Sequence, residues 1–216
     1  MEPACLVTGK SSQLLAEIVH HSIETQHRTL VARSGHLELP GPETPAASTV
    51  TWNRRSPLSA RSVILHAQNL YKRLDQAIIA YSPTRETVPF HESSIVSIED
   101  RVDAEVKGYQ FLLREIIGLF QKQGQGRLIL AVLDNGGELR SPLAAAALGS
   151  FMAAAEAMRR YYQNERFGIQ LLYSQSEDAQ AYARFILQTM IAAIPRRQRG
   201  SWIRFPSRSG IFTLGR

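Results

Sequence analysis

Hydrophobic residues in this chain form two patterns. Some occur in short uninterrupted runs, and others recur every three or four residues. The run Leu128–Leu133 is apolar throughout, and a run that does not alternate is typical of a strand buried on both faces. Other short runs are apolar or rich in β-branched residues. Together they predict strands at Ala4–Val7, Thr29–Ala32, Thr49–Trp52, Gln76–Tyr81, Leu128–Leu133 and Ile169–Tyr173, with a last strand within Trp202–Phe205 or Gly210–Leu214.

Helices are predicted between these strands, where apolar residues recur at helical spacing. Ser97-Ile-Glu-Asp100 is close to a capping box, in which an acid follows a hydroxyl residue three positions later, and it precedes a long periodic stretch. The predicted helices are Gln13–His20, Ser59–Leu74, a long helix over about 100–122, Leu143–Tyr162 and Glu177–Ile194.

The alternation of strands with helices determines the fold class that we predict. Parallel strands need a crossover connection, and a helix is the usual one. The sequence therefore predicts a doubly wound, Rossmann-like α/β fold with three α/β/α layers and about seven parallel strands. No low-complexity segment divides the chain, so we expect residues 1–216 to form a single domain. In such sheets, ligands bind at the carboxyl ends of the strands, near the switch in strand order.

Composition and charge add little to this picture. A net charge of +6 permits an anionic partner without choosing one. The chain begins with neither a signal peptide nor an apolar stretch long enough to cross a membrane, so we expect a cytoplasmic protein with no membrane partner. Its lone Cys5 lies in an apolar run, which favours a buried core residue.

Basic and aromatic residues alternate near the end of the chain, in a segment that comprises Arg196, Arg197, Arg199, Trp202, Arg204, Phe205, Arg208 and Arg216. Such a segment can stack on and neutralise a nucleic acid. A basic loop that leads into the last strand explains the same residues. We therefore do not expect nucleic-acid binding, and keep it as a third hypothesis.

The six histidines give no sign of a metal site. No two of them are four residues apart, and neither a nearby cysteine nor an HExxH motif is present. The sequence also lacks the GxSxG and GxxxxGK[ST] motifs. We therefore predict no metal site and no hydrolase or P-loop chemistry.

Over nearly its whole length the chain resembles the short-chain dehydrogenase/reductase family. The resemblance rests on the order of weak motifs: Leu6-Val-Thr-Gly9, Leu30-Val-Ala-Arg33, Leu74–Tyr81, Val106-Lys-Gly108 with Phe111, Gly124–Ile129 and Ala146–Phe151. In this family a TGxxxGxG turn lets the backbone approach the cofactor diphosphate. Thr8 and Gly9 begin that turn, but Gln13 and Leu15 replace its later glycines, and we expect their side chains to displace the diphosphate.

Weak cofactor-binding candidates remain around this turn. The ammonium of Lys10 and the hydroxyls of Ser11 and Ser12 are able to meet a phosphate in a different pose, but we favour a helix cap beside a solvated lysine as their explanation. Arg33 stands where the resemblance implies an arginine for the 2′-phosphate of NADP. With Thr8 and Gly9, these residues are the cofactor-binding candidates, although we expect no cofactor.

The resemblance also implies where the catalytic residues should be. Ser141 and Ala145 stand in place of the family's tyrosine and the lysine that lowers its pKa. Asp134, or the neighbouring Asn135, replaces the serine after the fifth strand, and Glu105 replaces an asparagine. We therefore predict no catalytic residues at the family positions. A rebuilt site would draw on Tyr81, Asp134, Glu105 and Ser141.

The resemblance implies a homodimer through the helices at about 100–122 and 143–162. Small residues on the second helix would let two helices approach closely, and four large residues would fill the seam. The small residues are Ala144–Ala147, Gly149, Ala153–Ala155 and Ala157, and the large ones are Leu119, Phe120, Phe151 and Met152.

Our leading hypothesis is a pseudoenzyme of this family, which is a catalytically inactive, dimeric binding or structural protein. The first alternative is an NADP-dependent oxidoreductase with relocated catalytic residues. The second is a basic protein that binds phosphate or nucleic acid.

Overall fold

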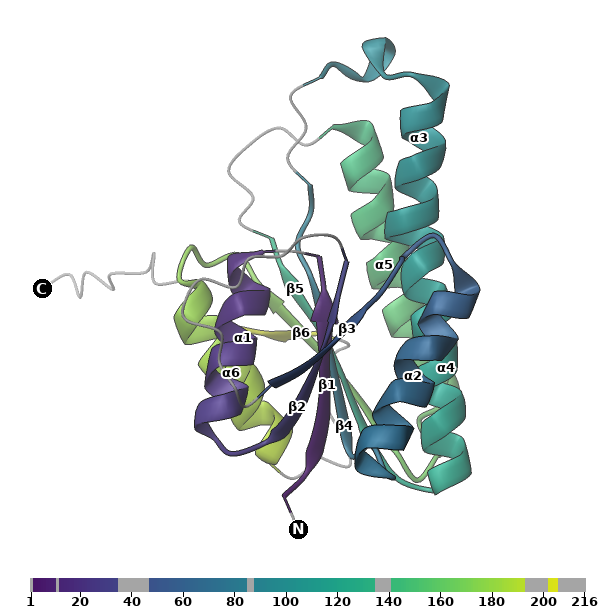
Figure 1. Ribbon diagram of the computed structural model, residues 1–216. Helices are drawn as coiled ribbons and strands as arrows, with labels where there is room; N and C mark the ends of the chain where they lie inside the picture. Colours follow the sequence, from purple (N-terminus) through teal and green to yellow (C-terminus); the bar gives the residue numbers. More distant parts are fainter. Residues whose placement is uncertain are drawn as a thin grey trace, which may run out of the picture.

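In the computed structural model, the part of the chain that the structure describes forms one parallel sheet of seven strands, in the order β3-β2-β1-β4-β5-β6-β7 (Figure 1). The structure describes residues 2–10, 12–34, 47–84, 88–134, 141–192 and 202–205. The strands are β1 (Ala4–Gly9), β2 (Arg28–Arg33), β3 (Ala47–Thr51), β4 (Gln76–Tyr81), β5 (Arg127–Leu133), β6 (Gly168–Ser174) and β7 (Ile203–Arg204). Every neighbouring pair is parallel.

Helices cover both faces of the sheet (Figure 1). Helices α1 and α6 pack together on one face, and α2, α4 and α5 lie on the other. This arrangement confirms the predicted three-layer, doubly wound fold. The helices are α1 (Gln13–Glu24), α2 (Pro57–Tyr71), η1 (Phe90–Glu92), α3 (Ile95–Arg101), the π-helical turn η2 (Val102–Lys107), α4 (Gly108–Gln123), α5 (Pro142–Tyr161) and α6 (Ala179–Ile191).

Short polar side chains begin several of these helices. The side chain of the residue before each helix accepts a hydrogen bond from a backbone N–H of the first turn, which would otherwise lack an acceptor. The capping residues are Ser12 for α1, Ser56 for α2, Ser94 for α3, Ser141 for α5 and Asp178 for α6.

The long predicted helix begins earlier than the sequence pattern indicated. Its cap is Ser94 instead of Ser97, whose backbone N–H donates to the Ser94 side chain. Helix α3, the turn η2 and α4 then follow without a break, and Figure 1 shows α3 rising above the sheet edge where the strands end. A π-helical turn alters the helical period, which explains why spacing alone misplaced the start.

Two other boundaries refine the sequence expectations. Helix α2 ends at Tyr71, short of the predicted Leu74, because Lys72 takes a positive φ of 64° and closes the helix. The last strand lies within the first of its two predicted positions, Trp202–Phe205. The other position, Gly210–Leu214, lies outside the described residues. Within the described part of the chain, no helix is long and apolar enough to cross a membrane.

The sheet reverses its winding between β1 and β4, which are neighbours although β2 and β3 separate them in sequence. Crossovers from β1 run in one direction and those from β4 in the other, so the loops after these two strands diverge. The edge formed by the carboxyl ends of β1 and β4 is therefore the place to look for a site.

Two glycines of α4 provide a test of how closely this helix packs. A Cβ on Gly108 would lie 2.3 Å from the backbone oxygen of Arg54, whereas a Cβ on Gly118 would meet nothing within 4 Å. We expect Gly108→Ala to lower the free energy of unfolding by about 1–3 kcal/mol, because backbone must move to admit the methyl group. Gly118→Ala should raise it by up to about 1 kcal/mol, through helix propensity. Urea unfolding measures both, and equal effects would contradict the close packing at Gly108.

Candidate functional site

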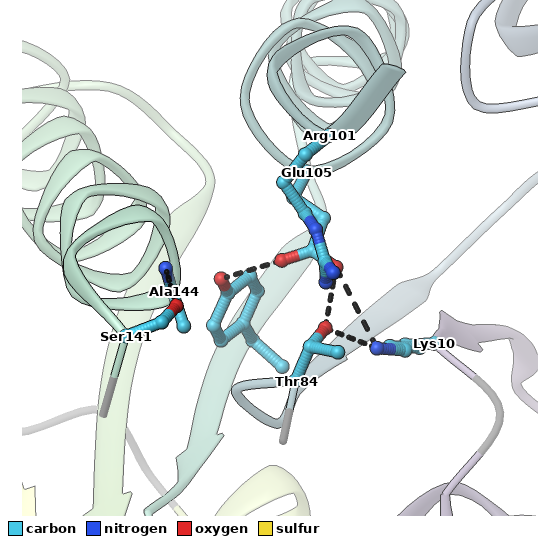
Figure 2. Close-up of polar contacts among 7 residues, drawn as sticks. Lys10, Thr84, Arg101, Glu105, Ser141 and Ala144 are labelled. Carbon is cyan, nitrogen blue, oxygen red and sulfur yellow. Dashed lines mark hydrogen bonds and ion pairs between the residues drawn. The ribbon is translucent and has the colours of Figure 1, made fainter. Parts of the chain in front are cut away.

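Four polar side chains from three parts of the chain meet at the β1–β4 edge. Lys10 follows β1, Thr84 follows β4, and Arg101 and Glu105 lie one helical turn apart on α3 and η2. Figure 2 shows these side chains converging on the Glu105 carboxylate. We call these four residues the Glu105 cluster.

Glu105 is the centre of the cluster and is only 4% exposed. Its Oε1 accepts a hydrogen bond from Thr84 Oγ1 at 2.6 Å and one from an Arg101 guanidinium nitrogen at 2.9 Å. Lys10 Nζ lies 3.5 Å from the same oxygen and also donates to Thr84 Oγ1. A buried carboxylate is costly unless it is paired and hydrogen-bonded, and here one oxygen has three partners.

Tyr81, the last residue of β4, lies against the other carboxylate oxygen. Its hydroxyl points to Glu105 Oε2 across 3.5 Å, the outer limit of a hydrogen bond. Its ring stacks on Phe151 of α5, with centroids 4.6 Å apart, and contacts Tyr109 of α4. Tyr81 is thus a buried side chain that joins the sheet to two helices.

The cluster alters the pKa values of its members. Burial acts to raise the pKa of Glu105, but the Thr84 hydrogen bond and the charges of Lys10 and Arg101 outweigh it and hold this pKa below its usual value. Burial lowers the pKa of Lys10 despite the attraction of Glu105. Burial, and then the charge of Glu105, raise the pKa of Tyr81 well above that of a free phenol. At neutral pH the carboxylate is therefore charged and the phenol is protonated.

Gly9 and Thr8 have structural roles at the end of β1. Gly9 pairs with Ala80 of β4, and a Cβ on Gly9 would lie 2.2 Å from the Ala80 backbone oxygen. The buried Thr8 hydroxyl donates to the Ala32 backbone oxygen on β2. Strand packing thus requires both residues whether or not a nucleotide binds.

We expected the side chains of Gln13 and Leu15 to displace a diphosphate at the β1–α1 turn, and the structure corrects this expectation for Leu15. Leu15 is buried in the core between α1 and the sheet, so its side chain does not fill the space of a diphosphate. Gln13 is exposed at the first position of α1. The Ser12 hydroxyl accepts from the Leu15 backbone N–H as a helix cap. Ser11, another cofactor-binding candidate, lies outside the described residues.

Ser141 precedes α5, which begins at Pro142 instead of the predicted Leu143, and Ala145 lies in the first turn of this helix. The Ser141 hydroxyl accepts from the Ala144 backbone N–H at 3.1 Å, and Figure 2 shows this pair apart from the Glu105 cluster. Ala145 is exposed on the same helix. At this position Ser141 therefore serves as a helix cap.

Asp134 and Arg33 lie at the ends of their strands, as expected. Asp134 is buried after β5 and accepts a hydrogen bond from the Tyr173 hydroxyl of β6 at 2.8 Å. Arg33 is the last residue of β2, and its backbone oxygen accepts from Trp52. Asn135 lies outside the described residues. Of the four residues proposed for a rebuilt site, contacts in the described residues bring Tyr81 and Glu105 together, whereas Ser141 and Asp134 bond elsewhere.

Sequence reasoning missed Thr84 and Arg101. Arg101 and Glu105 are four residues apart on one helix, a spacing typical of ion pairs, so the sequence did contain a signal for that contact. No pattern singles out Thr84, because its position depends on how the chain leaves β4.

The basic C-terminal segment is described only at residues 202–205. There the Trp202 ring nitrogen donates to Glu156 of α5 at 2.7 Å, and the Arg204 guanidinium lies over the Tyr173 ring. These two side chains pack against their own protein. The remaining basic residues of the segment lie outside the described range.

The helices predicted to form a dimer expose a different set of residues from the one expected. Leu119, Phe120 and Phe151 are buried within the subunit, so they do not fill a seam between subunits. Ala144, Ala147 and Ala155 are also buried. The small residues that α5 exposes are Ala145, Ala146, Gly149, Ala153 and Ala157. A groove of about 660 Å³ lies between α2, α4 and the end of α5, lined in part by Leu65, Gly118 and Met158.

Comparisons of the sequence with known proteins identify one relative and no family. No family model matches the chain. An uncharacterized protein of Treponema pallidum (strain Nichols) is 23% identical over 164 residues, which are 74% of this chain and 74% of that protein.

Among solved structures, a short-chain dehydrogenase from Streptomyces avermitilis is similar over 95% of this chain and 88% of its own, with a TM-score of 0.75 and 12% identity. A metagenomic short-chain oxidoreductase in complex with NADP is similar over 94% and 96%, with a TM-score of 0.73 and 12% identity. The chain thus has the fold of short-chain dehydrogenases. At this level of identity, the likeness extends to the fold alone.

The Glu105 cluster predicts a pH-dependent stability. Because the pKa of folded Glu105 is below the ordinary carboxyl value of 4.5, its contribution is complete above that value and is lost as the pH falls through the folded pKa. Glu105→Gln should lower the free energy of unfolding at neutral pH by about 2–4 kcal/mol, since two cations lose their partner. It should also flatten the acid limb of the stability profile.

Asp103→Asn is the matched control, because Asp103 forms an exposed ion pair with Lys107 on the same π-helical turn. It should cost less than about 1 kcal/mol. Urea unfolding from pH 7 down to pH 3 measures both variants. Equal losses for the two, or an unchanged acid limb in Glu105→Gln, would show that the cluster does not stabilise the fold.

Proposed function

We propose that this chain is a binding or structural protein with the fold of short-chain dehydrogenases, that it does not catalyse hydride transfer, and that it acts as a homodimer. The environment of Tyr81 carries this proposal. The tyrosine of the β1–β4 edge is buried and faces a carboxylate instead of an ammonium group. Burial, and then the carboxylate charge, raise its pKa, whereas general acid–base catalysis needs it lowered.

The other polar groups at this edge supply no substitute. Glu105 is held in its charged form by three partners, and the Ser141 hydroxyl is used as a helix cap. General acid–base catalysis is most effective when the pKa of the acid or base lies near the working pH. Neither the Glu105 carboxylate nor the Tyr81 phenol meets that condition, and Ala145 has no titrating group.

The described residues also fit a dinucleotide poorly. The Ser12 hydroxyl and the Lys10 ammonium, which would have to meet its phosphates, are engaged in a helix cap and in the Glu105 cluster. The exposed Gln13 stands where the family has a glycine that lets the backbone approach the diphosphate. We therefore expect no NADP binding, and derive no reaction step through a cofactor.

Dimer formation is supported by the exposed small residues of α5. Ala145, Gly149, Ala153 and Ala157 follow one another at intervals of four, so they lie along one side of the helix. Small residues let two helix backbones approach closely, and a self-complementary patch suits a two-fold interface. The groove between α2, α4 and the end of α5 is a further surface that would take larger side chains of the partner.

Nucleotide binding tests the first part of the proposal. A ligand present at a hundredfold excess over its Kd adds about 2.7 kcal/mol of stability, or about 5–10 °C in Tm for a chain of this size. We expect NADPH and NADP at about 1 mM to shift the Tm by less than about 1 °C, and NADPH absorbance to stay constant with a panel of carbonyl compounds. A shift of several degrees together with carbonyl reduction would favour the alternative, an NADP-dependent oxidoreductase.

A charge on the exposed face of α5 tests the dimer. We expect the protein to sediment as a dimer, and Ala153→Glu to sediment as a folded monomer, because the new carboxylates would be buried at the contact. Gln188→Glu, at an exposed position of α6 on the opposite face, adds the same charge and should leave the dimer intact. A monomeric wild type, or an Ala153→Glu dimer of unchanged affinity, would refute this interface.

A further inference from the structure

The last two turns of α1 bring two imidazoles and a carboxylate together, away from the Glu105 cluster. A nitrogen of His20, a nitrogen of His21 and a carboxylate oxygen of Glu24 all lie within 4.8 Å of one another. The side chains of His20 and Glu24 are 59% and 54% exposed, whereas that of His21 is 8% exposed. The group is therefore open to solvent on one side and anchored in the protein on the other.

The distances between these atoms suit ligands of one metal ion. His20 Nε2 lies 3.2 Å from Glu24 Oε1, and His21 Nδ1 lies 2.6 Å from Glu24 Oε2. In a tetrahedral zinc site with bonds of about 2.0–2.1 Å, neighbouring ligand atoms are about 3.3 Å apart. The side chains of His20 and Glu24 are exposed, so their torsion angles can adjust toward that geometry.

Glu17 lies one helical turn before His21, and its carboxylate is near the second ring nitrogen of that histidine. His21 Nε2 is buried without a hydrogen-bond partner among the described residues, and the nearest carboxylate oxygen, Glu17 Oε2, is 3.9 Å away. If Nδ1 binds a metal, Nε2 carries the proton, 3.9 Å from the Glu17 carboxylate. Histidine ligands usually have such an outer partner, which fixes the tautomer and raises the basicity of the ligating nitrogen.

The surrounding charges are mixed. Glu17 and Glu24 are negative and Arg184 of α6 is positive, and Arg184 is close enough to influence Glu24. The two carboxylates outnumber the one guanidinium, and their negative charge attracts a divalent cation.

We propose that His20, His21 and Glu24 bind a divalent transition metal ion, with zinc as the expected occupant and water completing the coordination. Two imidazoles and one carboxylate suit zinc better than magnesium or calcium, which prefer oxygen ligands. Helix α1 runs back from the β1–β4 edge, so the ion would lie toward the opposite end of the molecule. Its role there is to hold the last turn of α1.

The sequence pattern hid this site. A search for paired histidines expects them four residues apart, whereas here His20 and His21 are adjacent and a carboxylate occupies the fourth position. Each histidine reaches Glu24 separately, one across three residues and the other across four.

The test is zinc binding by the full-length, tag-free protein after treatment with a chelator. Calorimetric titration with zinc chloride should give one site per chain, and cobalt should give the visible absorption of a tetrahedral centre. His20→Ala and Glu24→Gln should each weaken zinc binding at least about tenfold. Glu17→Gln should weaken it by about tenfold through the outer contact.

His66→Ala is the matched control, because His66 is an exposed helical histidine on α2; it should bind zinc like the wild type. His20 and Glu24 are both exposed, so their variants should fold, and urea unfolding in the presence of chelator confirms that they do. Absence of zinc binding by the wild type would overturn the proposal. So would unchanged affinity in His20→Ala and Glu24→Gln, or an equal loss in His66→Ala.

Discussion

A buried carboxylate must be neutralised, and at the β1–β4 edge this requirement ties three parts of the chain together. Glu105 is on the turn η2, while its partners Lys10 and Thr84 follow two central strands and Arg101 precedes it by one helical turn. Because removal of any partner leaves charge in a poorly solvated place, the loops after β1 and β4 are held against η2. The arrangement of the edge follows from that single group.

The same interaction explains the character of the site. The charge that fixes the loops also raises the pKa of the neighbouring Tyr81 and is itself stabilised in the ionised form. Polar residues that the sequence suggests as catalytic candidates thus form hydrogen bonds and ion pairs that stabilise the fold. The hydroxyls of Ser12 and Ser141 fit this pattern, since each caps the N-terminus of a helix.

Much of the fold was predictable because periodicity reflects burial. The continuous apolar run at Leu128–Leu133 is buried strand, and the helical repeats from Leu14 to Val19 face the sheet. The start of the long helix was not predictable from spacing, since η2 changes the period. At the site, the alanine-rich repeat predicted the helix that contains Ala145, although α5 begins one residue before the predicted start, after the Ser141 cap. The partnership of Lys10 with Thr84 depends on where two loops meet, and such a contact has no sequence period.

Gly9 has a consequence for interpreting other chains of this architecture. Its contact with Ala80 shows that the first and fourth strands approach too closely at that point for any side chain. Selection for sheet geometry alone would retain such a glycine after all nucleotide affinity had disappeared. A threonine–glycine pair at the end of an initial strand is therefore evidence of backbone crowding, and only the residues of the loop beyond it can indicate that a ligand binds.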